Sequence, residues 1–148
     1  MRFKILISFV FWIVLFGISN SLAQRTSIFG KWQTIDDNTE KPRSIVEIYK
    51  KDGKAFGKIE KLILEPHEDP DPVCDKCDED DQRYNQKVIG MEIIKNLVKD
   101  DDEWEDGTIL DPDNGSVYDC KLWVEDGKLQ VRGYIMFFFR TQEWLPTE

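Results

Sequence analysis

The sequence contains few of the residues and motifs from which most catalytic sites are built. It has one histidine, His67, and three cysteines among 148 residues. It lacks a Gly-x-Ser-x-Gly nucleophile elbow, a glycine-rich phosphate-binding loop and a His-Glu-x-x-His zinc motif. Acidic residues are so abundant that two neighbouring carboxylates carry no information about catalysis. These absences predict a protein that is not an enzyme and that needs no cofactor.

Basic residues are also in the minority. Twenty Lys and Arg residues stand against 29 Asp and Glu residues, which gives a net charge of −9, and no basic cluster interrupts the acidic background. Such a chain repels the phosphates of nucleic acids and anionic lipid surfaces. The sequence therefore predicts no nucleic-acid partner. Its length and its 41% hydrophobic content predict one folded domain.

The N-terminus has the pattern of a secretory signal peptide. Arg2 and Lys4 precede an uncharged run over residues 5–18, and small residues, Ser21 and Ala23, stand before Gln24. A retained membrane anchor is the alternative, but this run is shorter than the roughly 20 apolar residues that cross a bilayer. We expect cleavage after residue 23, with no stable membrane insertion afterwards and a periplasmic or secreted location. The remaining domain, residues 24–148, carries a net charge of −11, because cleavage removes two charged residues and both are basic.

The domain shows hydrophobic alternation with a period of two and no sustained helical period. Asp52-Gly53 and Asp126-Gly127 each join two alternating runs, as in tight hairpins. Residues 88–98 fit both periods, and we interpret them as a strand. The expected strands cover residues 30–36, 44–51, 54–64, 88–98, 104–110, 116–125, 128–136 and 138–145. Eight short strands without a covering helix favour an all-β antiparallel barrel over a two-sheet sandwich, since closure removes exposed edges.

Several segments resemble the domain of unknown function 2147 family of bacterial exported proteins. They are Gly30-Lys31-Trp32-Gln33-Thr34, Gly57-Lys58-Ile59, Cys74-Asp75-Lys76-Cys77, residues 109–115 with Tyr118, residues 129–134, and Arg140-Thr141-Gln142 with Trp144. Gly30-x-Trp32 is also similar to the signature of lipocalins and other calycins. The resemblance implies a lipocalin-like barrel in which Trp32 closes one end against an arginine, Arg140 or Arg132. Met136-Phe137-Phe138-Phe139 departs from this pattern, because we expect smaller residues there.

The aromatic content and the barrel fold predict a binder of a small apolar or amphipathic ligand at the open end. A solid core filled by side chains is the alternative, because eight-stranded barrels lie near the size at which a cavity disappears. The residues expected to line the interior or to close the barrel are Trp32, Tyr118, Leu122, Val124, Leu129, Val131, Ile135 and Arg140.

A second cluster of interest lies in a long acidic loop, residues 65–86. Cys74-x-x-Cys77 predicts a disulfide staple, with half of a metal site or a redox pair as alternatives. A metal would also need His67, and Cys120 is a remote fourth ligand. The crowded carboxylates lack the spacing of a calcium-binding loop and indicate a solvated surface. This loop is also the candidate contact surface if the protein is instead a solid-core interaction or stress-associated module of the cell envelope.

Overall fold

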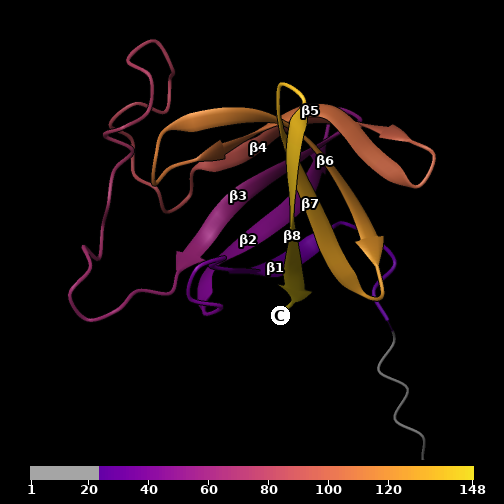
Figure 1. The fold of residues 1–148 in the computed structure, drawn as a ribbon, viewed down its shortest axis with the longest axis horizontal. Helices are drawn as coiled ribbons and strands as arrows, with labels where there is room; N and C mark the ends of the chain where they lie inside the picture. The colour runs from indigo at the N-terminus through magenta and orange to yellow at the C-terminus, as the bar shows by residue number, and fades with distance from the viewer. Residues whose placement is uncertain (1–23) are drawn as a thin grey trace, which may run out of the picture.

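A computed structural model describes residues 24–148, which form a closed eight-stranded antiparallel barrel (Figure 1). The strands follow one another around the barrel in sequence order, and β8 returns to β1. Their bounds are β1 Gly30–Ile35, β2 Pro42–Lys51, β3 Lys54–Leu62, β4 Glu92–Asp100, β5 Glu103–Asp111, β6 Ser116–Glu125, β7 Lys128–Ile135 and β8 Phe138–Pro146. The predicted signal peptide lies outside the described residues. Among those described, no helix is long and apolar enough to span a bilayer.

The two Asp-Gly hairpins form where the sequence predicts them. Asp52 and Gly53 adopt φ angles of 51° and 80°, and Asp126 and Gly127 adopt 50° and 75°. Two successive residues with positive φ form the turn whose twist matches that of the flanking strands. These turns fix the β2–β3 and β6–β7 registers, which bring Ile48 opposite Gly57 and Leu122 opposite Val131.

The alternating apolar side chains meet in a single core inside the barrel. All eight strands contribute residues to it. One of them is β4, which confirms from Glu92 onward the prediction that residues 88–98 form a strand. The side chains that are almost inaccessible to solvent and form the centre of this core are Trp32, Val46, Ile48, Ala55, Ile94, Leu97, Leu110, Leu122 and Leu129. The barrel interior is therefore solid over much of its length.

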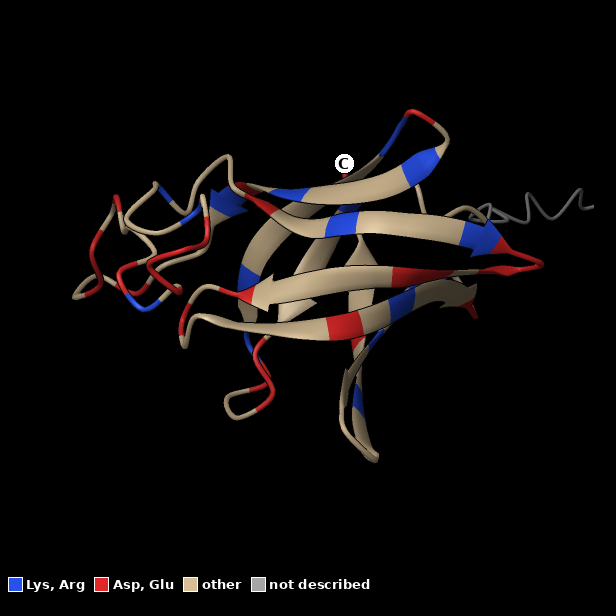
Figure 2. Cartoon of the chain, turned by 90° about the horizontal axis from the view of Figure 1, so that it is seen from above, with Lys and Arg blue, Asp and Glu red and all other residues tan. Residues whose placement is uncertain are grey.

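The two ends of the barrel differ. At one end, residues 24–29 lie beside the β4–β5 and β6–β7 turns. At the other, the loop between β3 and β4 projects far from the barrel, as Figure 1 shows at its left. This long connection contains the predicted acidic loop, and one isolated bridge, Val73 to Lys87, ties its two limbs together. Acidic residues, red in Figure 2, recur along it. The open end of the barrel is thus bordered by a long, charged segment.

Candidate functional site

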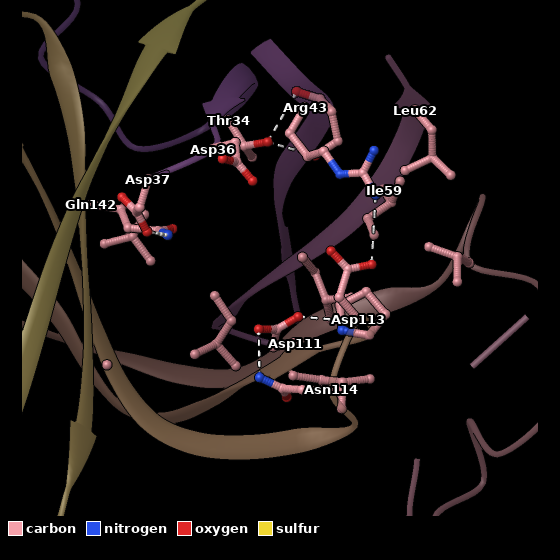
Figure 3. A pocket seen from close by; sticks show the side chains of 18 of the residues that line it. Thr34, Asp36, Asp37, Arg43, Ile59, Leu62, Asp111, Asp113, Asn114 and Gln142 are labelled. Atoms are coloured by element: carbon pink, nitrogen blue, oxygen red, sulfur yellow. Dashed lines mark hydrogen bonds and ion pairs between the residues drawn. The ribbon is translucent and has the colours of Figure 1, made fainter. Parts of the chain in front are cut away.

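A cavity of about 900 Å³ opens at the end of the barrel where this long connection lies. Its deepest wall is apolar and consists of the core residues Ile59, Ile93, Leu110, Val131 and Trp144. A half-buried layer lies above them and consists of Ile35, Leu62, Ile109, Tyr118 and Gln142. The side chains drawn in Figure 3 come from several strands and turns and converge on the same space. The interior is therefore solid toward one end and hollow toward the other.

The rim of the cavity is charged and mostly acidic. Its carboxylates belong to Asp36, Asp37, Glu68, Asp69, Asp75, Asp111 and Asp113, whereas its cations are Arg43, Lys76 and Arg140. Arg43 bridges segments that are distant in sequence, with 2.6 Å to Glu68 and 3.7 Å to Asp113. Arg140 pairs with Asp37, which also accepts a hydrogen bond from Gln142. These ion pairs leave an excess of negative charge around the opening.

Two rim carboxylates, each at the start of a turn on opposite sides of the opening, differ in their surroundings. Asp36 accepts hydrogen bonds from Thr39 and Asn38, with the backbone N–H of Thr39 as the main cause of its lowered pKa. Asp111 lies closer to the apolar wall, and its desolvation raises the pKa of its carboxyl group. It accepts hydrogen bonds of 3.0 Å from the Asp113 backbone and 2.9 Å from the Asn114 amide. Asp111 thus shapes the turn, as its place before Pro112 predicts, and also faces the cavity (Figure 3).

A disulfide between Cys74 and Cys77, as the sequence predicts, holds one wall of the cavity. Both cysteines are buried, and the Lys76 ammonium donates a 3.0 Å hydrogen bond to the Asp113 carbonyl in the β5–β6 turn. Gly115 lies against this segment with a φ of 75°, and a Cβ atom there would come within 1.8 Å of the Lys76 carbonyl oxygen. This segment of the acidic loop is therefore packed against the β5–β6 turn and forms part of the site, although the rest of the loop projects away from the barrel.

The alternative metal site is not assembled in this structure. Cys74 and Cys77 share a disulfide bond, so neither offers the thiolate that a zinc ion requires. Cys120 is buried in the barrel core, and burial raises the pKa of its thiol to about 12. Within residues 24–148, no three His, Cys, Asp or Glu side chains come together in a way that could hold a metal ion. His67 lies instead on the cavity rim.

The interior residues predicted from alternation fall at three levels. Tyr118, Val131 and Ile135 line the cavity, whereas Leu122 and Leu129 lie in the solid core. Val124 belongs to the opposite end, beside residues 24–29. Ile135 requires a correction, because 54% of its surface is exposed even though it borders the cavity. The alternation continues through it, but the β7–β8 hairpin has already passed beyond the barrel wall.

The predicted partner of Trp32 also requires a correction. Trp32 is buried and donates a 2.7 Å hydrogen bond to the Ile28 carbonyl, but the arginine over its ring is Arg25, at 5.2 Å. Arg140 lies on the cavity rim, and Arg132 lies over Trp123 and Phe139. The Arg25 guanidinium lies directly against the backbone of Gly30. A Cβ atom on Gly30 would come within 3.0 Å of this guanidinium, and Gly30 has a φ of 121°. These contacts explain physically why glycine precedes the tryptophan by two residues.

Sequence reasoning missed Arg25 and the rim residues Arg43, Asp37 and Gln142 as parts of a site. Arg25 precedes the Gly-x-Trp motif, whereas the resemblance directed attention to arginines near the last strand. The rim residues carry no local motif, because they meet only when the barrel closes. The polar residues after the first expected strand and in the 111–115 turn were a usable signal, since barrel strands end together at one rim.

The closed eight-stranded barrel with a cavity at one end has a lipocalin-like fold. Protein HP1028 from the human pathogen Helicobacter pylori, which belongs to the lipocalin family, has a similar structure, with a TM-score of 0.70 and 16% sequence identity. The match covers 84% of this chain and 85% of that one. The chain belongs to the family described as uncharacterized proteins conserved in bacteria, DUF2147, whose model matches residues 30–145. No curated protein sequence matches the chain.

Proposed function

We propose that the protein binds a small apolar or amphipathic ligand in the cavity at the open end of the barrel, without catalysis. The cavity volume supports this proposal, since typical small-molecule sites measure about 300–1,000 Å³. The apolar wall suits a hydrocarbon or aromatic group, whose burial contributes about 25 cal/mol per Å². The lipocalin-like fold is consistent with such a role.

The rim favours particular polar groups on the ligand. Its carboxylates outnumber its cations, and Arg43 and Arg140 are already paired with them. A carboxylate head group would meet repulsion from this rim, whereas an amine or a neutral polar group would not. We therefore propose that an amphipathic ligand enters tail first and leaves a cationic or neutral head at the opening.

Gly133 provides a way to fill the cavity without disturbing the backbone. It lines the cavity, its φ lies outside the left-handed region, and a Cβ atom there would meet only Tyr118 Cβ, at 3.7 Å. We expect Gly133→Phe to weaken binding of the neutral dye N-phenylnaphthylamine by about tenfold or more, because the ring occupies the space of the ligand. The matched control Gly133→Ala should bind as the wild type does. Dye fluorescence titrations measure both.

The same dye tests the head-group preference. Decylamine should displace it at lower concentration than decanoate, which has a similar tail and the opposite charge. Unchanged dye binding in a folded Gly133→Phe protein would contradict the cavity as the site, and the absence of any dye binding to the wild type would contradict the ligand-binding proposal itself. Circular dichroism and thermal unfolding establish that each variant is folded.

We propose further that the protein works outside the cytoplasm, in the periplasm or after secretion. The Cys74–Cys77 disulfide supports this location, because such bonds persist in oxidising compartments. The alternative role of the acidic loop as a surface for a partner protein stays a prediction. A pull-down with and without residues 65–86, on a barrel shown to remain folded, tests it.

A further inference from the structure

The tip of the β7–β8 hairpin, residues 135–139, carries five consecutive apolar side chains that solvent reaches. Met136 is 88% exposed, Phe137 94% and Phe138 77%. The hairpin stands away from the barrel at the bottom of Figure 2, where its end carries no charged residue. Exposed apolar groups that are contiguous, rather than scattered, mark interaction sites. The exposed side chains of this tip therefore indicate contact with an apolar partner.

The chemistry of the turn differs from that of the other tight hairpins. The β2–β3 and β6–β7 hairpins turn at Asp-Gly, whose side chains suit water and positive φ angles. Here Ile135 pairs with Phe138, so Met136 and Phe137 form the two-residue turn, and Met136 has a φ of 52°. The Met136 and Phe137 side chains do not stabilise a turn that is exposed to water. Their contribution to the free energy becomes favourable only when the tip is buried away from water.

Below the tip, the outer face of the hairpin changes from apolar to amphipathic. The rings of Tyr134 and Phe139 lie 6.2 Å apart, and the guanidinium of Arg132 lies 4.4 Å from the Phe139 ring and 4.9 Å from the Trp123 ring. Arg132 donates a hydrogen bond to the Thr141 hydroxyl and makes no ion pair with any carboxylate of residues 24–148. Aromatic side chains with a polar group and long basic side chains are those that lie at the head-group level of membranes.

We propose that this hairpin tip inserts into the surface of a lipid bilayer with zwitterionic head groups. Met136, Phe137 and Phe138 would enter the acyl boundary, while Tyr134 and Arg132 would meet head groups and phosphates. A narrow convex tip can insert into a fluid bilayer, whereas a protein partner would need a pocket of complementary shape. The acidic rim excludes attraction to an anionic surface as the driving force. The docking is peripheral and concerns only the hairpin.

The position of the tip connects this surface to the cavity. Ile135, Phe138 and Phe139 also line the cavity opening. Docking would therefore place the opening at the membrane surface, where a ligand could pass between the bilayer and the apolar wall with little exposure to water. Docking itself does not depend on the proposed ligand binding, so each can fail without the other.

A fluorescent label at the tip tests the insertion directly. Phe137→Cys offers one reactive thiol, because Cys74 and Cys77 are disulfide-bonded and Cys120 is buried with a raised pKa. An environment-sensitive label at this residue should shift to shorter wavelength when phosphatidylcholine vesicles are added, and the shift should persist at about 0.5 M salt, because apolar insertion is not screened. The same label at Lys54→Cys, at the opposite end of the barrel, should not shift. The label reads residue 137 alone, so the N-terminal apolar run does not affect it.

Unlabelled variants provide the second measurement. Phe137→Ser with Phe138→Ser should lower partitioning into the same vesicles by about tenfold or more. Val98→Ser, which removes an apolar side chain that is 43% exposed on the barrel wall, should leave it unchanged. The absence of a label shift, or equal partitioning of the double variant and the wild type, would overturn the proposal. So would a wild type that pairs with a second copy through these phenylalanines, shown by sedimentation, and ignores vesicles.

Discussion

At the scale of single residues, Asp81 and Arg83 show how a charge pair orders the acidic loop. The Arg83 guanidinium donates hydrogen bonds of 2.9 Å and 2.6 Å to the two carboxylate oxygens of Asp81, and a third of 3.3 Å to the Glu92 carbonyl in β4. The two bonds from the Arg83 side chain to Asp81 are the main cause that lowers the pKa of Asp81 to about 2. Charge-assisted hydrogen bonds with fork geometry are stronger than neutral ones. The pair therefore anchors the end of the loop to the barrel.

The lowered pKa gives this contribution a definite pH dependence. An acid whose pKa falls on folding stabilises the folded state above its ordinary pKa, here 3.8, and the stabilisation is lost as the pH falls toward 2. We expect Asp81→Asn to reduce the free energy of unfolding by about 1 kcal/mol at pH 7 and by progressively less below pH 4. Urea unfolding at several pH values measures this. Asp80→Asn, at an exposed neighbour that does not contact Arg83, serves as the control, and parallel pH curves for Asp81→Asn and the wild type would contradict the assignment.

At the scale of the elements, the Cys74–Cys77 disulfide holds the loop as a wall of the cavity. It closes a ring of few residues, so its effect on the entropy of the unfolded chain is small. Its larger effect is local, because the segment that it constrains includes Asp75 and Lys76 on the cavity rim. The disulfide thus influences the site more than the stability of the barrel.

We expect Cys74→Ala with Cys77→Ala to lower the free energy of unfolding by only about 1 kcal/mol, because the closed loop is short, and to leave the far-ultraviolet spectrum of the barrel unchanged. Dye binding in the cavity should weaken severalfold, since the wall becomes mobile. Reduction of the wild type should have the same two effects. Reduction of a Cys120→Ala variant should have them too, which would show that the third thiol is not their cause. Full dye affinity after removal of the disulfide would show that the loop does not shape the site.

The elements were more predictable from the sequence than the site was. Alternation and the two Asp-Gly turns are local signals, and they were enough to predict eight strands and their antiparallel order. The exposure of Ile135 was not predictable, because alternation indicates which face a side chain occupies and not where the barrel wall ends. The rim depends on contacts such as Arg43 with Glu68, which form between segments that only the closed barrel brings together.

At the scale of the whole molecule, the barrel depends on the seam between its first and last strands. This seam is short, with Trp32 opposite Pro146 and Gln33 opposite Leu145. Arg25 reinforces it from outside the strands, because its guanidinium donates 2.8 Å and 2.7 Å hydrogen bonds to the carbonyls of Lys31 and Thr147. One side chain therefore ties the N-terminal segment, β1 and the residue after β8 together over the ring of Trp32. Signal cleavage before Gln24 would retain this arginine.

We therefore expect Arg25→Ala to lower the free energy of unfolding by about 2 kcal/mol, through two lost charge-assisted hydrogen bonds and the lost cation–π contact. Arg25→Lys should lie between this variant and the wild type, because an ammonium lacks the planar fork that reaches both carbonyls. Arg140→Ala is the matched control: it removes a largely exposed ion pair, so it should cost less than about 1 kcal/mol. Urea unfolding followed by tryptophan fluorescence compares the three. The reverse order, with Arg140 more costly than Arg25, would restore Arg140 as the residue that closes the barrel.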